Sequence, residues 1–277
     1  MEWHNLWVLQ HKELRDAWRN RWFVLYALMF VVLALAMSWV SVVGVLGSGF
    51  AGLGRTAASL INLVVLIVPL MGLTLGSAAI AADRESGLLL YTYSQPVSLG
   101  EIVTAKFWGL ASALLAALLA GFGGAALVIA GPVAGGEAGA FAGFLVLSML
   151  VALAAASVGL CISSLCNSAS TAAGVALFVW LLLVLVGDLG LMGTSLVLDM
   201  SVPVLLGLAL VNPLQVFKLA AVVTIRGGSE VLGPAGLYAT RTLGDGLLPL
   251  LVTVLLAWIV VPLLATLVVL RRRGVLA

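Results

Sequence analysis

The chain has 277 residues with a formal net charge of +2, and 63% of its residues are hydrophobic whereas only 9% are charged. A soluble domain carries roughly 25% charged residues, so this composition excludes a soluble globular protein. The small net charge gives no indication of a nucleic-acid partner, and we expect the chain to lie in a lipid bilayer.

Six stretches are long and uncharged enough to cross a membrane, whose hydrocarbon core takes about 20 residues of helix. Backbone polar groups in hydrocarbon must be bonded within their own segment, so each stretch is expected to be a helix. The predicted fold class is an all-α integral membrane protein, with residues 1–277 as a single transmembrane domain. The expected spans are 23–46, 60–82, 107–130, 139–164, 169–187 and 247–270.

Residues 1–21 form a polar segment before the first span. On a helical wheel its tryptophans and other apolar side chains gather on one side, while Lys12, Arg15, Asp16 and Arg19 point away. Tryptophan opposite cations is typical of an amphipathic helix that lies in the membrane interface. The apolar side consists of Trp3, Leu6, Trp7, Leu14, Ala17 and Trp18.

The densest polar cluster, residues 83–106, lies between the second and third spans and reads DRESGLLLYTYSQPVSLGEIVTAK. Two acids and a base precede Gly87, and a run of leucine and tyrosine follows it. Exposed Leu and Tyr are costly in water unless they dock into a partner, so we expect a compact helix that ends before Pro96. Ser98 and Glu101 have the spacing of a capping box, which starts the next helix. From residue chemistry alone, a connector that lies on lipid headgroups stays an equal alternative.

Residues 188–246 separate the fifth and sixth spans and belong to the side opposite this loop. The apolar stretch 202–211 is too short to span the membrane alone. The following NPLQVFKLAAVVTIRGG begins with an Asn-Pro helix start signal. We expect two short helices over 196–224, either re-entrant or interfacial.

Orientation follows from the basic residues beside the spans, which favour the cytoplasmic side. With six spans, the N-terminal segment, the 83–106 loop and the C-terminal end share one side of the membrane. We therefore expect both termini in the cytoplasm. This side carries nine of the 13 Lys and Arg residues, which are Lys12, Arg15, Arg19, Arg21, Arg84, Lys106, Arg271, Arg272 and Arg273.

The loop sequence resembles the segment after the second span in permeases of ABC-2 type ABC transporters. In that family an acidic residue, G-T-L-x-x-L, a P-V-S element and a lysine recur; here the threonine is absent. The layout of nearly the whole chain is similar too, with an elbow helix at 1–21, six spans, and a long outer region. The corresponding loop residues are Glu85, Gly87, Leu88, Leu90, Pro96, Val97, Ser98, Glu101 and Lys106.

This resemblance implies a type V exporter-like fold and two copies of the chain, each paired with a cytoplasmic ABC ATPase. By analogy, the second and fifth spans are candidates for contact between the copies. ATP and Mg²⁺ belong to the ATPase, because this sequence has no G-x-x-x-x-G-K-[ST] motif. The permease is then no enzyme, and it binds no cofactor or metal itself. Its coupling helix docks on the ATPase with Glu85, Gly87, Leu88, Leu89, Leu90, Tyr91, Tyr93 and Pro96.

A narrower resemblance comes from NPLQVFKLAAV and EVLGPAGLYA in the outer region. They look like the permease family of the transporter that matures the copper centre of nitrous oxide reductase. That resemblance implies a place in the bacterial inner membrane and a periplasmic, copper-handling β-helix partner. Candidate contacts for this partner, as exposed charges on the outer side, are Arg226, Glu230, Arg241 and Asp245; solvated loop residues are the alternative.

Two actions stay open for such a permease. It exports a small compound between its two copies, or it transmits ATP-driven motion to the periplasmic partner without carrying a cargo. The span interiors hold almost no ionisable residues, and the methionines are scattered, so neither a proton relay nor a Cu(I) path is indicated. The sequence also leaves open an ABC-2 exporter for an unrelated substrate and a membrane anchor without motor coupling.

Overall fold

A computed structural model of the chain describes residues 3–48, 52–89, 98–130, 138–197, 202–224 and 244–273. Every regular element in these ranges is a helix, and the ranges contain no strand. The predicted all-α class is confirmed.

Six of these helices are long and apolar enough to cross a membrane, so the prediction of six spans is confirmed. Each predicted span falls within one helix, and most of the helices extend beyond the predicted bounds. The spanning helices are α2 (Arg21–Ser48), α3 (Gly52–Glu85), α5 (Leu99–Ala130), α6 (Ala138–Leu165), α7 (Ala169–Val197) and α11 (Leu247–Arg273).

Helix α5 begins earlier than its apolar run because a capping box starts it. The Ser98 hydroxyl accepts the Glu101 N–H at 3.3 Å, and the Glu101 carboxylate accepts the Ser98 N–H at 2.9 Å. These reciprocal bonds satisfy two of the unpaired N–H groups at the helix start. The predicted capping box is confirmed, and it places Lys106 inside the helix, near its start.

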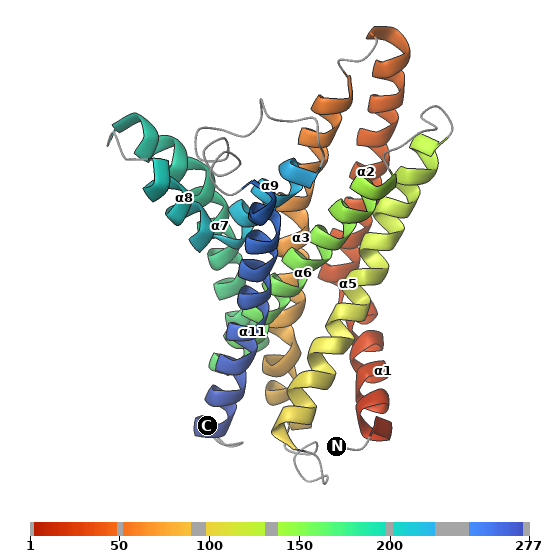
Figure 1. The fold of residues 1–277 in the computed structure, drawn as a ribbon. Coiled ribbons are helices and arrows are strands. Elements are labelled where there is room, and N and C mark those ends of the chain that lie inside the picture. Colours follow the sequence, from red (N-terminus) through yellow and green to blue (C-terminus); the bar gives the residue numbers. More distant parts are fainter. Residues whose placement is uncertain are drawn as a thin grey trace.

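Helix α3 is the most buried span and runs through the middle of the bundle (Figure 1). It packs directly on α6 because Gly72 and Gly76 face small residues there. A Cβ at Gly72 would lie 2.6 Å from the carbonyl oxygen of Ala152, and a Cβ at Gly159 would lie 2.7 Å from that of Leu73. Small residues four apart allow this approach, which is the usual way that membrane helices associate.

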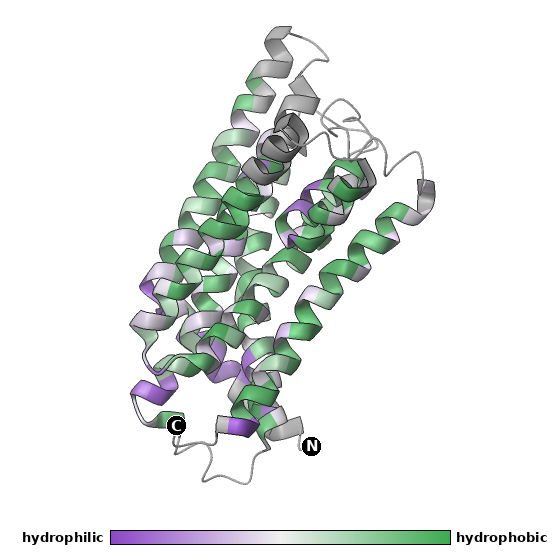
Figure 2. Cartoon of the chain, turned by 90° about the vertical axis from the view of Figure 1, so that its left-hand side faces the viewer, coloured by the Kyte–Doolittle hydropathy of each residue, from purple (hydrophilic) through white to green (hydrophobic). Residues whose placement is uncertain are grey.

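The outer faces of the bundle are apolar. Figure 2 shows hydrophobic residues along the lengths of the helices, with the largest group of hydrophilic residues at the end where both termini lie. Helices α7 and α11 are the least buried spans and expose leucine and valine, which would be costly in water. These surfaces therefore fit a lipid environment.

Two short helices, α8 (Val202–Val211) and α9 (Pro213–Thr224), lie between α7 and α11 in the chain. Asn212 starts α9: its side-chain oxygen accepts the Leu214 N–H at 2.9 Å, and its side-chain nitrogen donates to the Leu183 carbonyl of α7 at 2.7 Å. Helix α9 is packed against α6 and α11 with Phe217 fully buried. The predicted Asn-Pro start is confirmed.

Helix α1 (Trp3–Arg19) precedes the first span and packs along α5. Leu14 contacts the core, whereas Trp18 is exposed and meets the ring of Phe23 edge-on. The side chains of Trp3 and Trp7 lie outside the described part. Helix α1, the end of α3, the start of α5 and the end of α11 lie at one end of the bundle (Figure 1).

We expect Gly72→Ala to lower the thermal stability of the protein in detergent. Its added methyl would meet backbone atoms of α6, and such overpacking costs about 1–3 kcal/mol. Gly123→Ala in α5 is the matched control, because a Cβ there meets nothing within 4 Å and alanine favours a helix. A thermal unfolding scan of both purified variants checks this; equal melting temperatures would contradict the close α3–α6 contact.

Candidate functional site: the charged end of helix α3

A buried lysine ties three helices together at the end of the bundle that holds both termini. The Lys106 ammonium of α5 donates to Glu13 Oε1 of α1 at 2.7 Å, to Asp83 Oδ2 of α3 at 2.5 Å and to the Ala79 carbonyl of α3 at 2.8 Å. An ammonium group has three N–H donors, and all three are used here. Lys106 therefore fixes the positions of α1 and α3 on α5.

A second lysine balances the charge of this group. Lys12 Nζ of α1 lies 3.7 Å from Asp83 Oδ1 and 3.8 Å from Glu13 Oε1. We call these four residues, Lys12, Glu13, Asp83 and Lys106, the Lys106 cluster. Two cations face two carboxylates, so the cluster is neutral as a whole. Neutrality matters because an uncompensated charge in a buried place is strongly unfavourable.

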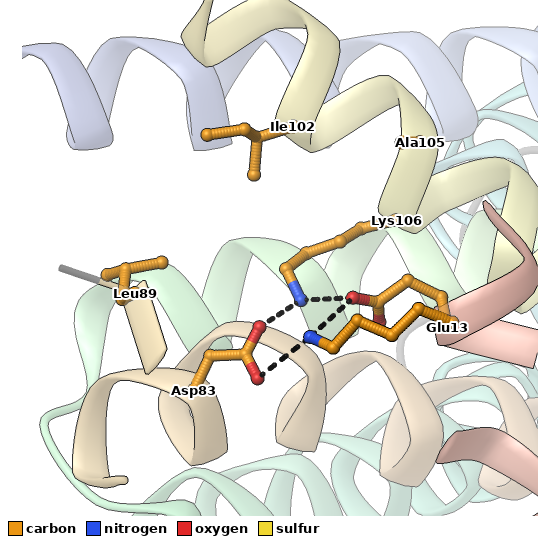
Figure 3. Close-up of a pocket in the computed structure, with 7 residues that line it drawn as sticks. Glu13, Asp83, Leu89, Ile102, Ala105 and Lys106 are labelled. Atoms are coloured by element: carbon orange, nitrogen blue, oxygen red, sulfur yellow. Dashed lines mark hydrogen bonds and ion pairs between the residues drawn. The ribbon is translucent and has the colours of Figure 1, made fainter. Parts of the chain in front are cut away.

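Three members of the cluster are shielded from water, whereas the Lys12 side chain is 39% exposed. The side chains of Lys106, Glu13 and Asp83 are 5%, 8% and 14% exposed, respectively. A small cavity beside them is walled by Leu89, Ile102 and Ala105 (Figure 3). Away from water, charge pairs interact more strongly than on a surface, and removing one partner would leave an uncompensated buried charge.

The next residue along α3 reaches α6. Arg84 Nη1 donates to the Cys166 carbonyl at 2.6 Å and to the Ser164 carbonyl at 3.4 Å. These carbonyls lie at the C-terminus of α6, where carbonyl groups lack partners within the helix and the helix dipole favours a cation. Arg84 therefore caps α6.

Glu85, the last residue of α3, reaches the start of α7. Its Oε2 accepts the backbone N–H of Ala169 at 2.9 Å, and the hydroxyl of Ser168 accepts the Thr171 N–H at 3.3 Å. A carboxylate at a helix N-terminus satisfies an unpaired N–H and suits the positive end of the dipole. The end of α3 thus contacts α1, α5, α6 and α7 through three consecutive residues.

Gly87 ends α3 and turns the chain back towards the bundle. Its φ is +74°, a left-handed conformation that favours glycine and often terminates helices. Two residues later Leu89 is 4% exposed and belongs to the core, while Leu88 is 45% exposed. The structure therefore separates the two leucines: Leu89 covers the Lys106 cluster, and Leu88 faces outward.

The other residues predicted for the two interfaces lie mostly outside the described part. Leu90, Tyr91, Tyr93 and Pro96 belong to 90–97, and Arg226, Glu230 and Arg241 belong to 225–243. Asp245 lies in a short 3-10 helix (Gly244–Gly246), and its side chain is outside the described part as well. Their assigned roles stay predictions.

Sequence reasoning missed Glu13 and the role of Lys106. Nothing in the sequence separates Glu13 from the exposed charges of the N-terminal helix, whereas in the structure Glu13 is buried on α5. Its neighbour across the contact is Gly109, which has no side chain to keep the two helices apart. The available signal was Lys106 itself, because a lysine within an apolar helix needs a counter-charge.

The charged groups of this site bind one another and the ends of neighbouring helices, so the site is a junction between helices. Among the described residues, no group of three or more His, Cys, Asp or Glu side chains could hold a metal ion. The carboxylates of the Lys106 cluster are already engaged by ammonium groups. What the site can do is pass a displacement of the segment after α3 to the helices joined there.

Comparison with known proteins decides the family. The model of the ABC-2 family transporter proteins matches residues 7–275, almost the whole chain. The chain belongs to the ABC-2 family. It is therefore the membrane-spanning permease subunit of an ABC transporter, as the loop sequence and the six-span layout predicted.

Two relatives share more than the family. The probable ABC transporter permease protein NosY of Stutzerimonas stutzeri is 35% identical over 276 residues, covering 98% of this chain and 99% of the relative. The protein of the same name from Pseudomonas aeruginosa is 35% identical over 220 residues, covering 77% of this chain and 80% of the relative. The likeness extends along the permease and is not confined to one motif.

We expect Lys106→Met to destabilise the permease by about 3–5 kcal/mol, because it leaves two buried carboxylates with only Lys12. Adding Glu13→Gln should recover part of this loss, since Lys12 and Asp83 then remain as a balanced pair. Chemical or thermal unfolding of the single and double variants in detergent measures both effects. A double variant that is less stable than Lys106→Met would contradict the charge-balance argument.

Proposed function

We propose that this permease converts ATP hydrolysis by a cytoplasmic ABC ATPase into movement of its helices, through the segment that follows α3. The observation that carries the proposal is the charged end of α3, where Asp83, Arg84 and Glu85 contact four other helices. A force applied to the next residues reaches these helices directly. A simple connector between two spans would not need contacts with four other helices.

Leu88 is the described residue that best fits a docking contact. It is exposed, apolar and one residue from the side chain that covers the Lys106 cluster. The other docking contacts with the ATPase are proposed to come from Glu85, Gly87, Leu90, Tyr91, Tyr93 and Pro96. Leu89 supports this surface from within the bundle.

The ATPase side of the membrane is proposed to be the cytoplasm, with the permease in a bacterial inner membrane. The end of the bundle that holds α1, the end of α3 and the end of α11 also holds the basic residues flanking these helices. Such residues favour the cytoplasmic side. Helix α1 is then the elbow helix, with Trp18 at the membrane interface.

A second copy of the chain and a periplasmic partner complete the proposed assembly. Of the second and fifth spans, α3 is largely buried, whereas α7 exposes Phe178, Leu181 and Leu185 along one face. Helix α7 is therefore the better candidate for contact between copies. The resemblance to the permeases of nitrous oxide reductase maturation suggests a copper-handling β-helix protein as the partner, with Arg226, Glu230, Arg241 and Asp245 as candidate contacts.

We propose that the permease transmits motion to this partner. The end of α3 touches α6, and α6 in turn packs against α9 in the outer region. This continuous contact gives motion a route across the membrane, and the nearly uncharged span interiors offer no polar path for an ion. ATP-dependent accumulation of a sulfur or copper species in inverted vesicles, lost without this chain, would favour export instead.

Leu88→Glu should abolish co-purification of the ATPase with a tagged permease. A charge buried in a docking cleft costs about 2 kcal/mol or more, roughly thirtyfold in affinity. Asn167→Glu is the matched control, because it adds the same charge to the exposed turn between α6 and α7. Mass spectrometry of the retained proteins is the readout. Full retention of the ATPase by Leu88→Glu would favour a membrane anchor without motor coupling.

A further inference from the structure

We propose that Lys106 is a positioning residue for coupling: it makes α1 and α5 follow α3 when the ATPase displaces the segment after α3. The inference rests on the proposed function and deepens it, because it names which helices move together and which side chain joins them. It follows from the different ways in which the helices pack at the two ends of the bundle.

Two pairs of the described helices approach each other closely at glycine residues. Helix α3 lies directly on α6 through Gly72, Gly76 and Gly159, and α1 lies directly on α5 through Gly109. Contacts between backbones of this kind leave little room for sliding. Each pair is therefore expected to move as a unit.

The two pairs are joined by different forces at their two ends. Towards the outer end, Phe122 of α5 packs edge-on against Phe144 of α6 at 5.4 Å and against Phe30 of α2 at the same distance. At the end of the bundle where α3 ends, α3 and α5 share few contacts. Lys106 supplies two hydrogen bonds there, to Asp83 and to the Ala79 carbonyl. Lys106 is thus the connection between the pairs where force enters.

The nature of the connection suits this role. One ammonium makes three hydrogen bonds to two helices, and the low exposure of Lys106, Glu13 and Asp83 keeps water from replacing them. The contacts of Arg84 and Glu85 with α6 and α7 are bonds to backbone groups, and the Glu85 contact is exposed. Helices α6 and α7 already pack along α3, so these bonds reinforce existing contacts, whereas the Lys106 cluster ties α1 and α5 to α3 at this end of the bundle.

Leu89 connects the cluster to the docking segment. It lines the same cavity as Lys106 and Asp83, and it follows directly on the outward-facing Leu88. Displacement of Leu88 by a bound ATPase therefore acts on the wall of the cluster as well as on the end of α3.

The test uses the tagged complex purified from its native cell, with the permease carrying Glu13→Gln and Lys106→Met together. This pair keeps Lys12 beside Asp83 and removes one positive and one negative charge, so the cluster stays neutral. Spin labels are placed at Arg15→Cys on α1 or at Asn167→Cys in the α6–α7 turn, after replacement of Cys161 and Cys166 by alanine. Both labelled positions are exposed. Label mobility and the distance between the two copies are compared without nucleotide and with ADP–vanadate.

In the unmodified cluster, we expect nucleotide to shift the signal at both labelled positions. In the double variant, the shift at position 15 should be lost while the shift at position 167 remains. A shift at position 15 equal to that of the unmodified cluster would overturn the inference. Absence of the ATPase from the unmodified complex, or no shift at either position there, would instead count against the proposed function. Glu13→Gln alone, which keeps Lys106 and its contacts with α3, should reduce the shift at position 15 without affecting that at 167.

Discussion

The organisation of this end of the permease depends on one ammonium group that is kept from water. Lys106 sits on an apolar helix, where an isolated charge would be expelled or neutralised. It is tolerated because Glu13, Asp83 and the Ala79 carbonyl use all three of its N–H groups. The same bonds help to hold α1 and α3 in place on α5. Because the buried lysine needs these partners, it favours one specific arrangement of α1, α3 and α5.

The bundle is held together by two kinds of contact, which have different effects on the helices. Glycine and alanine bring α3 against α6 through many weak interactions that depend on shape and extend along the helices. The Lys106 cluster acts at one point and depends on charge and hydrogen-bond geometry. The packing of α3 on α6 extends along both helices and holds them as one rigid unit. The Lys106 cluster joins helices at a single point. A permease that must both hold its shape and move under load needs each kind in its own place.

The architecture could be predicted from the sequence because lipid imposes simple rules. Length and lack of charge identify the six spans, and Ser98 with Glu101 identifies the start of α5 through local hydrogen bonds. The site was harder to predict, since Glu13 and Lys106 are 93 positions apart and no local rule pairs them. Only the close approach at Gly109 shows why Glu13 is buried while other charges of α1 are exposed. Leu88 and Leu89 likewise look alike in sequence, and the turn at Gly87 decides which of them faces outward.

The three charges at the end of α3 explain why so polar a cluster separates two long apolar runs. Each of them uses a different kind of partner: Asp83 meets ammonium groups, Arg84 meets the carbonyl end of α6, and Glu85 meets the amide end of α7. Because helix ends carry unpaired backbone groups of opposite sign, an acid, a base and an acid in succession can reach all of these partners from one helix terminus. Among the described residues, the end of α3 is therefore a place where α1, α5, α6 and α7 are all in contact with three consecutive side chains.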